Sequence, residues 1–178
     1  MRAHDLTTPG ESKDRFVEMF SRFLPLAMHY LRLEHLPKMV FKKSIGDTTQ
    51  PTFGMYVNDE KTLYVALVNR HPNDILRTVA HELQHYKQDS QHKLNPDSGT
   101  TGSPEENEAH AMAGIVMRHF NKKYPEYLSD RPVISESNKN LDYTEQLTFK
   151  LNEQLTSKPI PKFTALEWAT MEGGGSIS

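Results

Sequence analysis

The sequence predicts one α+β domain built around a helix that carries two histidines on the same face. Three observations predict this class. Apolar residues recur at helical spacing over residues 12–35, and three short β-rich segments follow between residues 37 and 68. Two helical segments then flank a polar loop at 91–104. Because the strands are grouped together and the chain has no internal repeat, we expect a small sheet packed against helices.

Composition narrows the classes of function. The chain has 178 residues, the size of one ordinary domain, with 36% hydrophobic residues, 25% charged residues and a formal net charge of −2. It shows no basic excess typical of nucleic-acid binders, no membrane-length apolar stretch and no N-terminal signal. We therefore expect a cytoplasmic protein without nucleic-acid or membrane partners. With no cysteine, disulfides, thiolate catalysis and cysteine–zinc sites are excluded, while nine histidines are candidate ligands.

The predicted domain spans residues 12–157, between a flexible leader at 1–11 and a C-terminal extension at 158–178. Its first helix is expected from an N-cap at Ser12 to about His35, with Pro25 kinking or dividing it. Strands are expected at 37–43, 52–57 and 62–68, the last two joined by a tight turn.

Two further helices follow the predicted strands. The first is expected to begin at Asn73 or Asp74 and to end near Ser90. The second is expected to begin after an N-cap at Ser103 and to end before Pro125, with alanines that allow close packing against the first. Shorter helices are expected at 143–155 and 164–169, before a glycine-rich end at 173–175.

The histidine-bearing helix contains the pattern His-Glu-x-x-His at residues 81–85. Positions i and i+4 lie on the same side of a helix, so His81 and His85 can offer two imidazole nitrogens to one metal ion. Glu82 lies beside that face, where its carboxylate can hold a water molecule and accept its proton. Zinc suits such ligands, and a catalytic zinc needs a third protein ligand and one open position.

The third ligand is expected from the start of the following helix, at residues 105–110. The pair of segments His-Glu-Leu-Gln-His at 81–85 and Glu-Asn-Glu-Ala-His-Ala-Met-Ala at 106–113 resembles the gluzincin type of metallopeptidase. It is most similar to the small ImmA/IrrE-like enzymes and to small zincin-like domains encoded by phages. The resemblance covers about residues 62–120 and implies a minimal zincin-like fold.

Matching the motifs assigns the glutamate ligand to Glu106. Glu108 matches the second acid of the family motif, and His110 replaces the family's asparagine or aspartate four positions after the ligand. In the family that position supports a zinc-binding imidazole, and a histidine there can support one or bind the metal itself. Glu108 and His110 therefore stay open as alternative ligands, whereas Glu105 is expected to be a helix-dipole partner.

The resemblance implies zinc-dependent hydrolysis of a protein or peptide, with Glu82 as the general base. It also implies that the strand at 62–68 forms a sheet edge on which substrate pairs. Candidate oxyanion donors are His92, His119, Tyr86 and Tyr124. If the chain is phage-encoded, the expected location is the host cytoplasm or the virion.

Two other functions compete with an active peptidase of this type. One is a catalytically silent zinc-binding module with a regulatory or protein-interaction role. The other is a nucleic-acid-associated, SprT-like protease, against which the net charge and the lack of cysteine argue.

Overall fold

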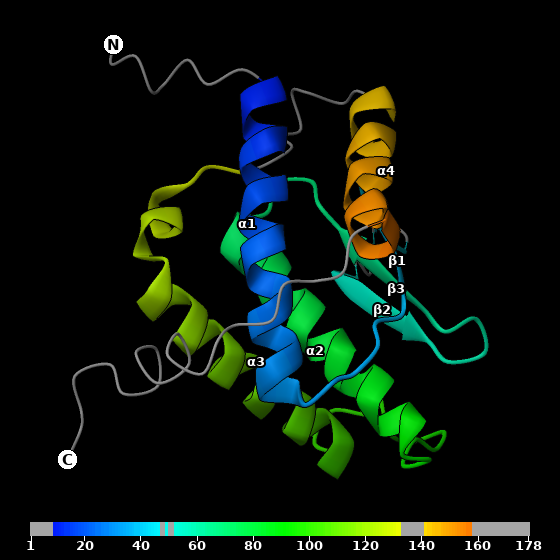
Figure 1. Cartoon of the computed structure of the whole chain (residues 1–178). Helices are drawn as coiled ribbons and strands as arrows, with labels where there is room; N and C mark the ends of the chain where they lie inside the picture. The colour runs from blue at the N-terminus through cyan, green and yellow to red at the C-terminus, as the bar shows by residue number, and fades with distance from the viewer. Residues whose placement is uncertain (1–8, 47–48, 50–51, 133–140, 158–178) are drawn as a thin grey trace, which may run out of the picture.

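The computed structural model of the chain describes residues 9–46, 49, 52–132 and 141–157. It confirms the α+β class: a helix, a three-stranded mixed sheet, two packed helices and a C-terminal helix (Figure 1). In chain order the elements are α1 (Pro9–Leu31), β1 (Lys38–Lys42), β2 (Gly54–Val57), β3 (Thr62–Ala66), α2 (Pro72–Ser90), α3 (Pro104–Lys123), the 3₁₀ helix η2 (Pro125–Ser129) and α4 (Leu141–Ser157). Within the described ranges, no helix is both long and apolar enough to cross a membrane.

Helix α1 contributes an aromatic face to the core. Phe16, Phe20 and Phe23 are buried, and edge-to-face contacts join them to Phe41 of β1 and Phe120 of α3. Burial of each such side chain stabilises the fold by about 1.5–3 kcal/mol. The helix begins at Pro9, before the predicted cap at Ser12, and it continues through Pro25 instead of dividing there.

The strand order is β1-β3-β2, with β1 parallel and β2 antiparallel to β3. The expectation that the strand at 62–68 forms the sheet edge is therefore wrong, because β3 is the central strand. Its residues Leu63 and Val65 on one face are fully buried, and Thr62 and Ala66 on the other face are each 5% exposed, as suits a strand covered on both sides. The edge strand next to α2 is β2, which is joined to β3 by the predicted turn.

The other edge of the sheet, β1, packs against α4 (Figure 1). Thr148 of α4 donates a hydrogen bond of 2.8 Å to the carbonyl oxygen of Phe41, and Leu147 and Leu151 are buried in the core. The opposite edge strand, β2, packs against α2 instead.

Helices α2 and α3 pack along each other through buried alanines, including Ala109 and Ala113 of α3. Ser103 caps α3 as predicted, since its hydroxyl accepts the backbone N–H of Glu106 at 3.1 Å. Helix α2 is capped differently from the prediction. The N-cap is His71, whose Nδ1 accepts the backbone N–H of Asn73 at 3.0 Å.

The helix predicted at 164–169 and the glycine-rich end lie outside the described residues, as do residues 1–8 of the predicted leader.

Candidate metal centre

The first turns of α3 place a carboxylate against the two histidines of α2. One oxygen of Glu106, Oε1, lies 3.0 Å from His81 Nε2, and its other oxygen, Oε2, lies 3.1 Å from His85 Nε2. The two histidine Nε2 atoms are 3.2 Å apart. The structure therefore brings together the three side chains predicted as metal ligands.

These spacings fit a small divalent ion. Ligands at the corners of a tetrahedron, each about 2.0–2.2 Å from a zinc ion, lie roughly 3.3–3.6 Å from one another. The distances of 3.0–3.2 Å among the three groups are close to that separation. Two imidazoles and a carboxylate also form a donor set typical of catalytic zinc. The group could hold a metal ion without a large rearrangement of either helix.

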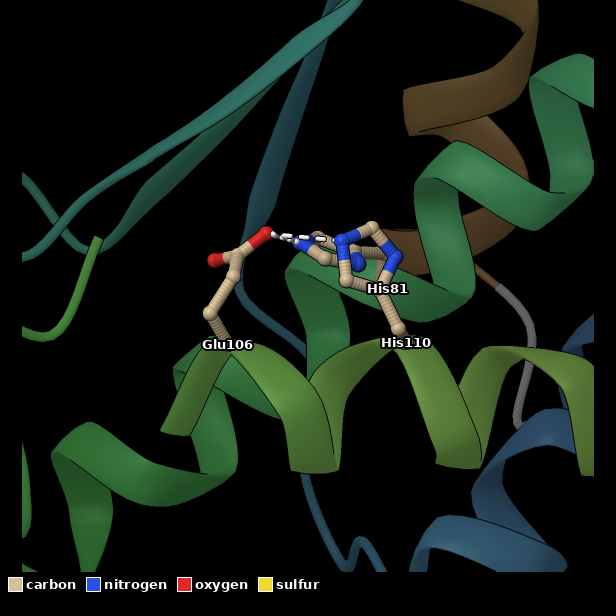
Figure 2. Close-up of side chains that lie close together, drawn as sticks. All are labelled: His81, Glu106 and His110. Atoms are coloured by element: carbon tan, nitrogen blue, oxygen red, sulfur yellow. Dashed lines mark ion pairs between the residues drawn. The ribbon is translucent and has the colours of Figure 1, made fainter. Parts of the chain in front are cut away.

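A further imidazole lies beside this group. His110 Nε2 is 3.1 Å from Glu106 Oε1, and His81, Glu106 and His110 have ligand atoms within 4.8 Å of one another (Figure 2). His110 sits one turn after Glu106 on α3, and its side chain is 70% exposed. His81 and His85 are each less than 15% exposed. His110 therefore contacts the cluster from its solvent side.

Burial keeps His81 neutral at pH 7. Desolvation lowers the pKa of this imidazole below its usual 6.5, and the carboxylate of Glu106 opposes the shift without cancelling it. The contact of His81 with Glu106 is thus a hydrogen bond from a neutral imidazole, not an ion pair. A neutral imidazole is also the form that binds a metal.

Glu82 has an unusual environment for a carboxyl group. It is 8% exposed, and burial raises its pKa from 4.5 to about 8, with the negative charge of Glu106 adding to the shift. The backbone N–H of Tyr56, on the edge strand β2, donates a hydrogen bond to this carboxyl group. A cation beside it would favour the ionised form. Strongly shifted carboxyl groups of this kind gather at functional sites.

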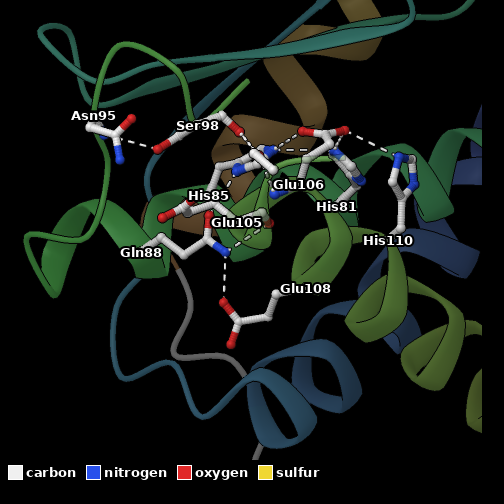
Figure 3. A network of polar contacts seen from close by, with 10 residues as sticks. His81, His85, Gln88, Asn95, Ser98, Glu105, Glu106, Glu108 and His110 are labelled. Carbon is white, nitrogen blue, oxygen red and sulfur yellow. Dashed lines mark hydrogen bonds and ion pairs between the residues drawn. The ribbon is translucent and has the colours of Figure 1, made fainter. Parts of the chain in front are cut away.

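Glu108 is held away from the ligand atoms. Its Oε2 accepts a hydrogen bond of 2.7 Å from the amide of Gln88 (Figure 3). That bond lowers the pKa of Glu108, and a bond from the amide of Gln84 acts in the same direction. The same Gln88 amide donates to the backbone carbonyl of Glu105 at 3.0 Å. Of the acidic residues at 105–108, only Glu106 is among the ligand atoms that gather around His81 and His85.

A cleft of about 440 Å³ opens onto the site. The edge strand β2 forms one wall with Gly54, Met55 and Tyr56. The loop after α2 forms another wall with Leu94, Asn95, Ser98 and Gly99. The remaining lining residues are Asn58, His81, Glu82, His85 and Glu106. The sequence predicted this loop only as a surface connection. Its internal hydrogen bonds, such as Ser98 Oγ accepting the backbone N–H of Asn95, hold it folded beside the cleft.

Gly54 lets β2 approach α2 closely. A Cβ atom built at this position would lie 2.3 Å from Cγ2 of Thr78 and 3.3 Å from Cγ of Glu82. A glycine is therefore required where the edge strand crosses α2.

None of the four predicted oxyanion donors is among the residues that line the described cleft. The ring of His119 stacks on Tyr30 at 4.2 Å, and Tyr86 packs against the ring of Tyr56. Tyr124 packs on Phe120 at the far end of α3.

Arg70, which follows β3 in the chain, is buried. Its guanidinium donates to the carbonyl oxygens of Phe53, Ala66 and Asp74. It also bonds the hydroxyl of Thr78. Arg70 therefore ties both strands of the hairpin to α2 without lining the site.

Sequence reasoning missed three contributors to the site: Gly54, Tyr56 and Gln88. Gln88 carried a detectable signal, because it is a polar residue on the buried side of α2, one turn after His85. The contributions of Gly54 and Tyr56 depend on the packing of β2 over α2, which no local pattern reveals.

Comparison of the chain with protein-family models, curated proteins and solved structures gives no match. The case for this site therefore rests on its own residues and geometry.

Proposed function

We propose that the chain is a zinc-dependent peptidase that hydrolyses peptide bonds in a protein or peptide substrate. The observation that carries the proposal is the position of Glu82, a buried carboxyl group in the same cleft as the group formed by His81, His85 and Glu106. A site that only held a metal for stability would have no need of this carboxyl group. The resemblance of the two motifs to those of gluzincin peptidases supports the same activity.

His81, His85 and Glu106 would hold the zinc, whose Lewis acidity makes a water molecule more acidic and polarises a carbonyl group. Glu82 takes the proton of the attacking water and passes it to the nitrogen of the leaving amine. The N–H of Tyr56 orients the carboxylate for both transfers.

Substrate would bind as an added strand along β2. Directly before this strand, the carbonyl of Phe53 faces β3, where it accepts the backbone N–H of Ala66 at 2.9 Å. Backbone groups alternate in direction along a strand, so Gly54 and Tyr56 turn theirs away from β3; the N–H of Tyr56 donates to Glu82, which leaves its carbonyl and the backbone of Gly54 for substrate. Pairing through main-chain groups would recognise an extended peptide with little dependence on its sequence.

One observation favours a second function. If His110 joined the other three side chains on the metal, the site would have four protein ligands and no open position, as in structural zinc sites. The chain would then be a silent zinc-binding module.

The test is cleavage of a mixed peptide library by zinc-loaded protein, read by mass spectrometry, for the wild type and Glu82→Gln. The glutamine keeps the shape of the side chain but cannot accept the proton. We expect wild-type cleavage that a chelator abolishes and zinc restores, and no cleavage by Glu82→Gln at unchanged zinc content. Equal cleavage by both proteins would refute the role of Glu82. An inactive wild type with one bound zinc would favour the silent module.

A further inference from the structure

Gln88 is a fully buried polar residue beside the candidate metal centre. It lies on α2 one turn after His85 and is not among the residues that line the cleft. Both ends of its amide are engaged: Oε1 lies 2.8 Å from His85 Nδ1, and Nε2 lies 3.0 Å from the carbonyl oxygen of Glu105 and 2.7 Å from Glu108 Oε2 (Figure 3). A buried amide with this many partners has a single favourable orientation.

The partners on α3 fix that orientation. A backbone carbonyl oxygen can only accept a hydrogen bond, so the amide nitrogen of Gln88 must face Glu105. The carboxylate of Glu108 requires the same arrangement. The oxygen of Gln88 therefore faces His85, and the contact of 2.8 Å is a hydrogen bond only if His85 Nδ1 carries the proton.

From this arrangement we propose that Gln88 is a positioning residue. It holds His85 with Nδ1 protonated and Nε2 aimed at the metal, and it ties α3, which bears Glu106, to α2, which bears the histidines. The proposal rests on the proposed metal site and adds a residue that controls it. In a neutral imidazole with a proton on Nδ1, the lone pair belongs to Nε2. That nitrogen is the one that lies 3.1 Å from Glu106 Oε2 and 3.2 Å from His81 Nε2.

The same side chain connects the two helices next to the ligands. Glu105 directly precedes Glu106, so a hydrogen bond to the carbonyl of Glu105 fixes the backbone from which the Glu106 side chain extends. Loss of the Gln88 amide would free the ring of His85 and remove one of the bonds that hold the first turn of α3, which would keep its cap at Ser103. Hydrogen-bond partners of metal-binding histidines typically contribute about 10–100-fold to metal affinity.

Gln84 provides a matched control. It is buried one turn before Gln88, and its amide also bonds Glu108, but it makes no contact with His85 that resembles the one from Gln88. The substitutions Gln88→Met and Gln84→Met each replace a buried amide on α2 with an apolar side chain of similar length. Both weaken the tie to Glu108, and only the first removes the acceptor for His85.

The experiment measures zinc affinity by competition with a chromophoric chelator, without any substrate. We expect Gln88→Met to weaken zinc binding by about 10–100-fold, and Gln84→Met to leave it near the wild-type value. Combining Gln88→Glu with Glu108→Gln returns an acceptor to His85 and a donor to its partner, but no donor to the carbonyl of Glu105, so it should recover only the part of the affinity that depends on the ring of His85. Equal losses for both methionine variants would overturn the proposal, because they would reduce Gln88 to a packing contact.

A measurement on the unmodified chain covers the case in which a variant does not fold. In zinc-loaded wild-type protein, long-range ¹H–¹⁵N spectra should show a proton on His85 Nδ1 that exchanges slowly with solvent, with Nε2 bound to the metal. Metal bound through Nδ1, or a rapidly exchanging Nδ1 proton, would overturn the proposal. Failure of the wild type to bind zinc would instead refute the metal site itself, so the two failures are distinguishable.

Discussion

Substituting Gly54 with alanine tests whether the edge strand must lie directly on α2. The new Cβ would stand 2.3 Å from Thr78 Cγ2, and real Cβ atoms essentially never come within 3.0 Å of another heavy atom. The strand must therefore move by at least about 0.7 Å (3.0 − 2.3). The side chain of Thr78 cannot rotate away freely, because its hydroxyl donates a hydrogen bond to the carbonyl of Asp74 and accepts one from the guanidinium of Arg70.

Forced overpacking of this kind costs about 1–3 kcal/mol of unfolding free energy. The movement would also draw the N–H of Tyr56 away from Glu82, so we expect turnover to fall more than zinc content does. Denaturant unfolding gives the first quantity, and peptide cleavage with metal analysis gives the second.

Two further variants make the test specific. Gly99→Ala changes another glycine of the same cleft, where an added Cβ meets nothing within 4 Å, and it should leave stability unchanged or slightly higher. Thr78→Ser removes Cγ2 but keeps the hydroxyl, so it should rescue Gly54→Ala. Wild-type stability for Gly54→Ala, or a loss that Thr78→Ser does not relieve, would refute the close approach of β2 to α2.

Three other predictions follow from the structure. The pKa of Glu82 is higher in the folded metal-free protein (about 8) than in the unfolded chain (about 4.5), so its stabilising contribution is lost as pH rises between those values. By pH 8 the unfolding free energy of Glu82→Gln, measured by denaturant titration, should exceed that of the wild type by up to about 5 kcal/mol. A difference that does not depend on pH would contradict this. Arg70→Met leaves buried carbonyl oxygens without their donor and should cost at least about 2 kcal/mol in the same assay, with wild-type stability as the contradicting result. His110→Asn should change zinc affinity by less than about tenfold if His110 only supports the site; loss of zinc would make His110 a ligand.

Much of the candidate metal site could be predicted because its determinants are local. The spacing of His81 and His85 places them on one face of α2 regardless of what surrounds the helix. Ser103 and Pro104 mark the start of α3, and the cap at Ser103 fixes the backbone of Glu106 within the first turn. The choice between Glu106 and Glu108 came only from the resemblance, and the structure separates them by their different partners.

The sheet was predicted less well because strand order depends on contacts between distant segments. The patterns located three strands correctly, yet no local signal shows that β1 pairs in parallel with β3 and leaves β2 at the edge next to the site. Leu63 and Val65 of β3 are fully buried, and a continuous apolar strand is typical of a central position. Such a run favours a central position but does not identify which strands pair with it.

The cap of α2 shows a different limit. Asn73 and Asp74 are common N-cap residues, whereas the observed cap is His71, which precedes Pro72. Proline favours the first turn of a helix, so the residue before it becomes the cap whatever its side chain. Here the ring nitrogen of His71 accepts the hydrogen bond from the backbone N–H of Asn73, the role that a serine or aspartate side chain usually has at an N-cap.

Zinc content per chain, measured by mass spectrometry on protein saturated with zinc and then desalted, tests the central claim most directly. The variants are Glu106→Ala and Glu108→Ala, two truncations of acidic residues in the same helix turn. We predict about one zinc per chain for the wild type and for Glu108→Ala, whose carboxylate bonds Gln88 instead of the ligand group, and little or none for Glu106→Ala. Full zinc content in Glu106→Ala, or no zinc in the wild type, would contradict the metal centre.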